Sequence, residues 1–297
     1  MQKIEACPIC QGKEFTLFLN CQDHSVSKEV FSIVQCENCS FKFTNPIPSE
    51  NSIGKYYKSE NYISHSDTKK GLVNRVYHIV RNITLKKKLN LVNSLSPKGN
   101  LLDVGCGTGY FLKTCKDDGW KIDGTEPDDH ARKLAEQNTQ QTLYSSVLQL
   151  EKIKQYNVVS MWHVLEHVHK LNETIIKLSM LLKDNGKLII AVPNSDSKDA
   201  ATYKENWAAY DVPRHLYHFN QKSMADLLSK HGFEIERTAP MKFDSFYVSM
   251  ISEGYISGNQ NVNYISSILN GWKSNIYGMF NKNNYSSIIY IARKKDK

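Results

Sequence analysis

The spacing of apolar and polar positions changes twice along the chain. Short strand-like runs, such as residues 14–19 and 29–34, dominate the region before residue 48. From Leu72 the apolar positions recur at helical spacing to about Leu95, where a Ser-Pro-Lys-Gly sequence predicts the end of a helix. From residue 96 onward, short apolar runs alternate with helical segments, a pattern typical of an α/β fold with a parallel sheet.

This alternation predicts individual elements. Strands are expected at 101–104, 120–125, 142–144, 157–161 and 187–194. A helix should begin near Tyr110, and Asp128 and Asn172 should cap the next two, because their side chains accept hydrogen bonds from free N–H groups at a helix start. Ser223 and Asp226 form a candidate capping box for a later helix.

Composition narrows the class of protein. The 297 residues include 40% hydrophobic and 23% charged positions, which is ordinary for a globular chain with a sizeable core. No window approaches the roughly 18 apolar residues of a membrane span, and no apolar leader precedes the first cysteines, so we expect a cytoplasmic protein without a membrane span. The net charge is +8, but the lysines are scattered, so nucleic acid is not an expected partner. The oligomeric state is not predicted.

Two C-x-x-C pairs lie near the start of the chain. They are Cys7 with Cys10 and Cys36 with Cys39. This spacing lets both thiolates of a tight turn face one ion, so we predict a four-cysteine zinc site; the alternatives are two disulfides or four separate thiols. Four protein ligands leave no open position, so the zinc would be structural. Cys21 and His24, between the pairs, are alternative ligands.

A glycine-rich loop follows the predicted strand 101–104. The dinucleotide-binding fingerprint would need a glycine where this chain has Tyr110, and the observed G-x-G-x-G pattern is instead typical of S-adenosylmethionine sites. Glu126, 21 residues after Gly105, ends the next predicted strand, where a carboxylate can accept both ribose hydroxyls of an adenosine. The alternative is a structural turn with a surface glutamate.

Residues 163–167 read HVLEH, which matches the inverted zinc-peptidase signature H-x-x-E-H. That mechanism needs both histidines on an established helix and a further carboxylate from a later helix. Here the segment follows the strand 157–161, at the end where open parallel sheets bind ligands. A metallopeptidase is therefore only a remote alternative.

From about residue 96 the chain resembles class I S-adenosylmethionine-dependent methyltransferases, through LLDVGCGTG, GTEP and VVSMWHVLEHV. CPIC and CENC resemble the zinc ribbon that a subgroup of bacterial small-molecule methyltransferases carries. The resemblance implies a Rossmann-like seven-stranded sheet of order 3-2-1-4-5-7-6 with an antiparallel seventh strand. Residues 232–237 and 287–293 would then be strands six and seven. It also implies a zinc ribbon at 1–48, a helical connector or lid at 49–95 and a methyltransferase domain at 96–297.

The resemblance further implies a set of cofactor contacts. They are Asp103, Gly105, Cys106, Gly107, Gly109, Glu126, Pro127, Ser146, Val147, Trp162 and His163. In this set the glycine loop faces the methionine portion, Glu126 holds the ribose, and Ser146 lies in the loop that reads the adenine. Many relatives have an acidic residue near that loop, and this chain does not.

Methyl transfer from a sulfonium is an in-line displacement, and a weakly acidic acceptor also needs a general base. The candidate bases are His163, His167, His215 and His218. The first two follow strand four, with His163 the better placed, and the last two lie in an insertion at 194–221. That insertion could border the substrate, or be a packed clamp in which Arg214 anchors a carboxylate.

These features predict a methyltransferase whose acceptor is a small molecule, with a saccharide or glycan-linked metabolite preferred because similar ribbons accompany sugar methyltransferases. The cofactors would be S-adenosylmethionine and a structural zinc ion. Aromatic residues at Phe243, Phe246 and Tyr247 could form an apolar wall over the pocket. The alternatives are an RNA or protein methyltransferase that docks through the ribbon and a scaffold that binds the cofactor without turnover.

Overall fold

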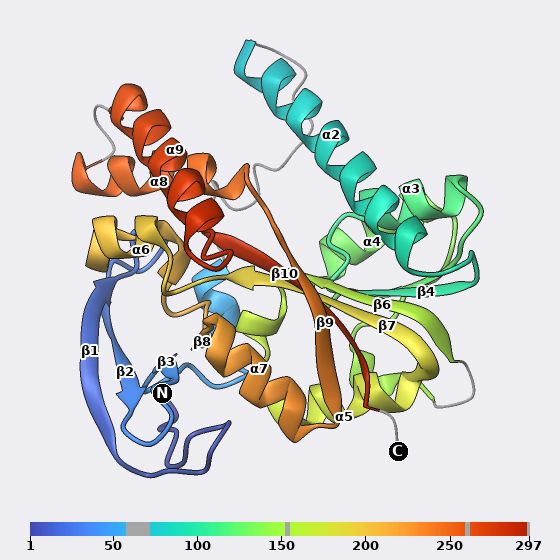
Figure 1. The fold of residues 1–297 in the computed structure, drawn as a ribbon, viewed down its shortest axis with the longest axis horizontal. Helices are drawn as coiled ribbons and strands as arrows, with labels where there is room; N and C mark the ends of the chain where they lie inside the picture. Colours follow the sequence, from blue (N-terminus) through green and yellow to red (C-terminus); the bar gives the residue numbers. More distant parts are fainter. Residues whose placement is uncertain (58–71, 152–154, 259–261, 296–297) are drawn as a thin grey trace.

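In a computed structural model, which describes residues 1–57, 72–151, 155–258 and 262–295, the chain is built around a twisted, mostly parallel sheet (Figure 1). Within the described residues the sheet has six strands in the order β5-β4-β6-β7-β10-β9. Their bounds are β5 (Lys121–Thr125), β4 (Asn100–Val104), β6 (Tyr156–Trp162), β7 (Leu182–Pro193), β10 (Ser287–Lys294) and β9 (Phe233–Pro240). Only β10 runs antiparallel to its neighbours, which agrees with the order that the resemblance implied.

The expected third strand, 142–144, is reduced to a single bridge between Thr125 and Tyr144. Two backbone hydrogen bonds attach Tyr144 to the edge of the sheet, through Gly124 and Glu126. The chain then leaves the sheet because Ser146 caps the 3-10 helix η2 (Val147–Gln149). Of the seven strands that the resemblance implied, the third is thus present only as this bridge.

Helices cover both faces of the sheet (Figure 1). The helices of one face are α2 (Leu72–Leu95), α3 (Tyr110–Asp117) and α4 (Asp129–Thr139), and those of the other are α5 (Leu171–Leu181) and α7 (Gln221–Lys230). Side chains alternate along β4, so Leu101 packs into a core with α3 while Leu102 packs into a second core with α5 and α7. Burial on both sides explains why these strands read as continuous apolar runs.

Helix starts follow the predicted chemistry only in part. Asp128 caps α4 and accepts a hydrogen bond from the backbone of Ala131 at 2.8 Å, as expected. The capping box of α7 consists of Asn220 and Ser223, so the expected pairing of Ser223 with Asp226 is wrong. Asn172 does not cap α5, because it lies inside the first turn and its side-chain amide donates to the carbonyl of Pro8.

The N-terminal region forms a second sheet, for which the described residues supply four strands. They are β1 (Phe15–Gln22), β2 (Val30–Cys36), β3 (Lys42–Thr44) and β8 (Tyr217–His218). Strand β8 comes from the insertion after β7, so the two distant segments share one sheet (Figure 1). Phe41 and Phe43 are buried in the same core as α5 and α7. The ribbon is thus packed on the main body rather than tethered to it.

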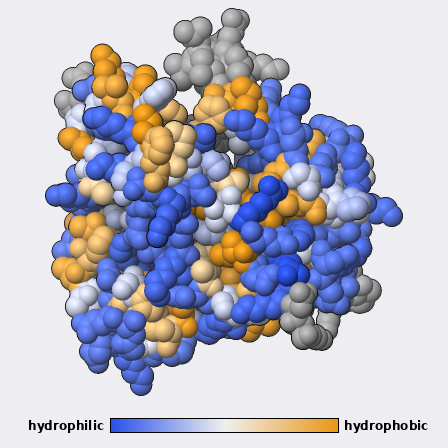
Figure 2. Space-filling model, in the orientation of Figure 1, coloured by the Kyte–Doolittle hydropathy of each residue, from blue (hydrophilic) through white to orange (hydrophobic). Residues whose placement is uncertain are grey.

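The remaining named helices lie in the insertion, between β9 and β10, and in two short turns elsewhere in the chain. They are η1 (Ile53–Tyr57), η3 (Leu165–His167), α6 (Lys198–Tyr203), η4 (Lys204–Asn206), η5 (Ala208–Tyr210), α8 (Asp244–Ile256) and α9 (Tyr264–Phe280). Apolar residues gather on the surface over α8 and α9, where Ile265 and Trp272 are exposed (Figure 2). Among the described residues, no helix is both long enough and apolar enough to cross a membrane.

Candidate active site

The glycine loop is fixed to the ends of β4 and β5. The backbone amides of Gly105 and Cys106 both donate to the carbonyl of Thr125, at 2.8 and 2.9 Å. Gly109 is the N-cap of α3, with φ of 80°, and a Cβ there would lie 2.8 Å from the Cα of Ala135. At Gly107, where φ is 54°, a Cβ would meet no described atom within 4 Å. The loop is thus closely packed against α4 at Gly109 but open at Gly107. An open backbone of this kind lets a ligand approach the N–H groups closely.

Glu126 lies over this loop at the end of β5. Its two carboxylate oxygens accept hydrogen bonds from the amides of Gly107, at 2.9 Å, and Asp128, at 3.0 Å. Burial raises the pKa of Glu126, although these two hydrogen bonds act in the opposite direction. Each oxygen keeps a lone pair, so the oriented carboxylate can still accept from a diol.

Asp103, at the end of β4, is almost fully buried and accepts a hydrogen bond from the hydroxyl of Ser160 at 2.6 Å. Burial raises the pKa of Asp103 to about 7, while Ser160 and the ammonium of Lys88 lower it. Lys88 comes from α2 and lies 4.3 Å from the centre of the Trp162 ring. The C-terminal ends of β4 and β5 therefore carry two buried carboxylates, Asp103 and Glu126, which suit a cationic ligand.

The remaining predicted cofactor contacts lie on either side of this edge. Pro127 is exposed, Val147 is buried, and the hydroxyl of Ser146 accepts from the backbone of Leu148. Trp162 is half-buried with its ring edge-on to Phe111. These positions are compatible with an adenine on one side and a methionine on the other, and the individual roles stay predictions.

His163, directly after β6, is held between two carboxylates. Its Nε2 lies 3.0 Å from an oxygen of Asp244 in α8, and its Nδ1 lies 3.3 Å from an oxygen of Glu166. Burial lowers the pKa of His163, but the two carboxylates outweigh it and raise the pKa to about 10. The ring is therefore protonated at neutral pH, which differs from the free base that the sequence suggested, because the partner Asp244 lies 81 residues away in the chain.

His167 and His215 lie together behind His163, with their ring centres 4.5 Å apart. His167 is in the turn η3 and His215 is in the insertion. Burial and the neighbouring His215 lower the pKa of His167 to about 4, so its ring is neutral. The structure thus unites two of the predicted histidines from separate parts of the sequence.

His218 faces a different neighbourhood. Its Nε2 lies 3.1 Å from the hydroxyl of Thr44 in β3, and its ring packs edge-on against Tyr210. Burial lowers the pKa of His218 well below its ordinary value. These contacts join the insertion to the ribbon and favour a structural role for His218.

The comparisons with known proteins agree with this geometry. Residues 78–238, more than half of the chain, match a family model described as a methyltransferase domain. The chain belongs to the S-adenosylmethionine-dependent methyltransferases. The HVLEH segment of this methyltransferase lies at a strand end and in a 3-10 turn, so the helix that an inverted zinc peptidase would need is not present in the described residues.

Curated relatives of the methyltransferase include the ubiquinone biosynthesis O-methyltransferase of Rickettsia bellii, which is 27% identical over 200 residues. That match covers 63% of this chain and 83% of the relative. The protein of the same name from Rickettsia typhi is 27% identical over 227 residues, or 71% of this chain and 90% of the relative.

Solved structures share the fold of the methyltransferase. Magnesium protoporphyrin IX methyltransferase from Synechocystis PCC 6803 with bound SAH gives a TM-score of 0.52 at 16% identity, over 81% of this chain and 97% of that one. A SAM-dependent methyltransferase from Archaeoglobus fulgidus gives 0.50 at 18% identity, over 72% of this chain and 94% of that one.

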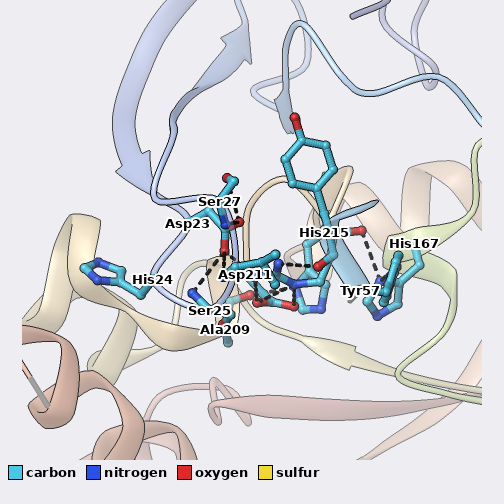
Figure 3. Close-up of polar contacts among 12 residues, drawn as sticks. Asp23, His24, Ser25, Ser27, Tyr57, His167, Ala209, Asp211 and His215 are labelled. Carbon is cyan, nitrogen blue, oxygen red and sulfur yellow. Dashed lines mark hydrogen bonds and ion pairs between the residues drawn. The ribbon is translucent and has the colours of Figure 1, made fainter. Parts of the chain in front are cut away.

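Arg214 clamps the insertion of the methyltransferase to the ribbon. Figure 3 shows its two carboxylate partners, Asp23 of the ribbon and Asp211 of the insertion. The buried guanidinium contacts Asp23 at 3.0 Å and donates from Nε to both oxygens of Asp211 at 3.0 Å. It also donates to the carbonyl of Tyr56 at 2.9 Å. The prediction that Arg214 anchors a carboxylate is confirmed, and the clamp fixes the backbone of the neighbouring His215.

The four paired cysteines of the methyltransferase converge. The sulfurs of Cys7 and Cys39 are 3.6 Å apart, those of Cys10 and Cys36 are 3.5 Å apart, and all four lie within 4.8 Å of one another. These separations exclude a disulfide and resemble the roughly 3.8 Å between sulfurs of a tetrahedral site with Zn–S bonds of about 2.3 Å. The donor set therefore fits one zinc ion.

Sequence reasoning missed two residues of the site. Asp244 lies in an aromatic stretch of the chain, and no local pattern marks it as a partner of His163. Lys88 was hidden in a run of three lysines that suggests a solvated helix face. Both residues come to lie in the site only because α2 and α8 pack near the ends of β4 and β6.

Proposed function

We propose that this methyltransferase transfers the methyl group of S-adenosylmethionine to a hydroxyl group of a small molecule. The proposal rests on one observation: two groups of functional residues lie near the C-terminal ends of the central strands. The open loop at Gly107 with the oriented carboxylate of Glu126 provides for a nucleoside, and the pair of His163 and Asp244 stands beside it. The O-methyltransferase names of the curated relatives support a hydroxyl acceptor.

In this proposal the cofactor lies across the ends of β4, β5 and β6. Its ribose hydroxyls would bind Glu126, and its carboxylate would face the free amides at the start of α3, where the helix dipole favours negative charge. Its sulfonium and ammonium charges would offset the buried carboxylates near Asp103. The adenine would lie between Pro127 and the loop of Ser146 and Val147.

The chemical step is an in-line displacement at the methyl carbon, which needs alignment and a dry site more than acid or base strength. A hydroxyl acceptor must also lose its proton. We assign that proton to the carboxylate of Asp244, because the ring of His163 is already protonated and can only donate to it; the side chains of Asp244 and His163 are 22% and 33% exposed and so can be reached by an acceptor. Glu166, on the other side of the ring, is buried and would orient the imidazole.

The surroundings of the pair favour an acceptor with an apolar body. Phe243 and Tyr247, on either side of Asp244, are 39% and 54% exposed, and the ammonium of Lys87 lies 4.7 Å from the Phe243 ring. An aromatic or lipid-linked acceptor would cover these rings. A saccharide or glycan-linked acceptor is the second candidate, because the four-cysteine cluster supports the ribbon resemblance on which that prediction rests.

The four cysteines are proposed to hold a structural zinc. Cys7 and Cys36 are fully buried beside Phe41 and Phe43, so the metal would fix the ribbon against the main core. It would supply folding free energy rather than chemistry, because four thiolates leave no open coordination position.

A calorimetric titration with S-adenosylmethionine tests the cofactor site. Glu126→Ala should weaken binding by about 10- to 100-fold, because hydrogen bonds to a charged group are lost. The matched control is Glu136→Ala, which removes another carboxylate that accepts a backbone amide, from Leu143, but away from the loop. Equal affinities in the wild type and Glu126→Ala, with both proteins folded, would refute the ribose contact.

Methyl-labelled cofactor with defined acceptors tests the reaction. His163→Gln should lower kcat by about 10²- to 10⁴-fold at unchanged cofactor affinity, and His130→Gln, an exposed histidine of α4, should leave kcat unchanged. Label on a hydroxylated aromatic lipid supports the first acceptor class, and label on a nucleotide sugar supports the second. Label only on RNA or protein would refute a small-molecule acceptor, and tight cofactor binding without transfer to any acceptor would indicate a scaffold.

A further inference from the structure

A second group of metal-ligand side chains lies apart from the four cysteines. Glu166 and His167 in η3 and His215 in the insertion place one ligand atom each within 4.8 Å of the others. Two imidazoles and one carboxylate form a common ligand set for divalent transition metals. The cofactor contacts proposed above use none of these three side chains.

Both histidines are oriented by carbonyl groups. Nδ1 of His215 lies 2.8 Å from the carbonyl oxygen of Ala209, and Nδ1 of His167 lies 3.0 Å from that of Arg214. A carbonyl can only accept, so each Nδ1 carries the hydrogen and each Nε2 keeps its lone pair. Metal-binding histidines are typically fixed in this way, with the second ring nitrogen donating to a carbonyl or a carboxylate. The hydroxyl of Tyr57, 3.0 Å from Nδ1 of His167, adds a further restraint.

Glu166 supplies the independent observation. The residue is 0% exposed, and within the described structure neither of its carboxylate oxygens accepts a hydrogen bond. Nδ1 of His163 is 3.3 Å from one oxygen, but the contact lacks hydrogen-bond geometry. A buried carboxylate is costly unless it is paired, hydrogen-bonded or bound to a metal. Apart from the ion pair of one oxygen with His163, the lone pairs of Glu166 are unused by the described residues, and they lie beside two imidazoles whose Nε2 atoms are also available.

We propose that Glu166, His167 and His215 form a second metal site, which binds a divalent first-row transition cation such as Mn²⁺, Co²⁺ or Zn²⁺. Harder cations such as Mg²⁺ and Ca²⁺ prefer oxygen ligands, and a thiol-seeking cation would choose the cysteines. Three protein ligands leave at least one coordination position for water or another oxygen ligand. The site therefore differs in kind from the closed four-cysteine site.

The site also differs from the peptidase arrangement that HVLEH suggests. In that arrangement His163 and His167 would be the ligands and Glu166 would stay free for catalysis. Here Glu166 is a ligand, His163 contacts it from outside, and the second imidazole comes from the insertion. The metal would tie the insertion to the end of β6, behind the pair of His163 and Asp244.

Cobalt titration of the full chain tests the proposal. The protein is first loaded with one equivalent of zinc, which the cysteines take. Co²⁺ is then added without cofactor or acceptor, so the result does not depend on the proposed methyl transfer. The wild type should bind one Co²⁺ with visible ligand-field bands and no thiolate-to-metal charge-transfer band. Glu166→Gln and His215→Gln should each weaken this binding by more than about 100-fold, since even outer-shell changes cost about 10- to 100-fold.

The matched control is His218→Gln, which alters another buried histidine of the same insertion outside the cluster. It should keep the wild-type Co²⁺ affinity. Folding of each variant is checked by thermal unfolding. If Glu166→Gln does not fold, the Co²⁺ affinity of His215→Gln tests the proposal instead. No binding of Co²⁺ by the folded wild type, a thiolate charge-transfer band, or equal affinities in the wild type and both ligand variants would overturn the proposal.

Discussion

The four-cysteine cluster and the cluster of Glu166, His167 and His215 both gather metal-binding side chains, but they are assembled in opposite ways. Each cysteine pair belongs to one tight turn, in which the amide of Gln11 donates to the carbonyl of Cys7 and that of Ser40 to Cys36. The histidine cluster instead needs the insertion to fold back on the end of β6. The first cluster is built from local turns, and the second depends on an already folded protein.

The two modes of assembly predict different contributions from the two metals. Thiolates crowded in a small ribbon repel one another, so we expect the ribbon to need an ion at these cysteines in order to fold. The histidines are held by carbonyls and by the clamp of Arg214, so their positions do not depend on an ion. The metal at the cysteines should therefore contribute mainly to the free energy of unfolding. The metal at the histidines should contribute mainly to binding a further ligand at its open coordination position. The predictions below test that contrast.

The largest effect should come from the cysteines. In Cys36→Ser/Cys39→Ser the chain should lose its zinc and at least about 5 kcal/mol of unfolding free energy, a part of the roughly 10–16 kcal/mol that structural zinc supplies to zinc-finger peptides. Zinc content and denaturant unfolding measure both quantities. The control is Cys115→Ala, a buried cysteine of the other core. Unchanged zinc content in the double variant would show that the four cysteines do not hold the zinc ion.

A smaller loss is expected at the clamp. Arg214→Met leaves Asp23 and Asp211 without their buried partner, which should cost about 3–5 kcal/mol. Zinc should stay bound at the four cysteines, because the clamp does not touch them. Arg132→Met, at a pair with the exposed Asp129, should cost less than about 1 kcal/mol. Loss of zinc in Arg214→Met would show that the two regions do not fold independently.

The smallest effect is expected at Tyr57. Tyr57→Phe removes the hydroxyl that contacts Nδ1 of His167, and a typical hydrogen bond contributes about 0.5–1.5 kcal/mol. His167 keeps its bond to the carbonyl of Arg214, so its orientation should survive. Denaturant unfolding measures the change, with the zinc content as the internal control. A loss as large as that of the cysteine variant would mean that Tyr57 has a larger structural role than one restraint on His167.

Much of the fold could be predicted because its signals are local. The glycine loop, Glu126 and the cap Asp128 lie within 24 residues of Gly105, and turn and helix chemistry alone positions them. The failures also have local reasons. The run 142–144 has strand-like residues, but Ser146 turns the chain away after one bridge. Asn172 was predicted as a cap, but α5 already begins at Leu171, and the side-chain amide of Asn172 donates to the carbonyl of Pro8.

The α/β alternation, the glycine loop with its terminal carboxylate, and the paired cysteines could be read from the amino-acid sequence, because each depends on neighbours in the chain. Three contacts became known only from the folded chain: His163 lies between Glu166 and Asp244, β8 pairs with the ribbon sheet, and His215 packs against His167. Those contacts join segments far apart in sequence, and the packing of the insertion and of α8 against the strand ends fixes them. Periodicity within one segment carries no information on such packing.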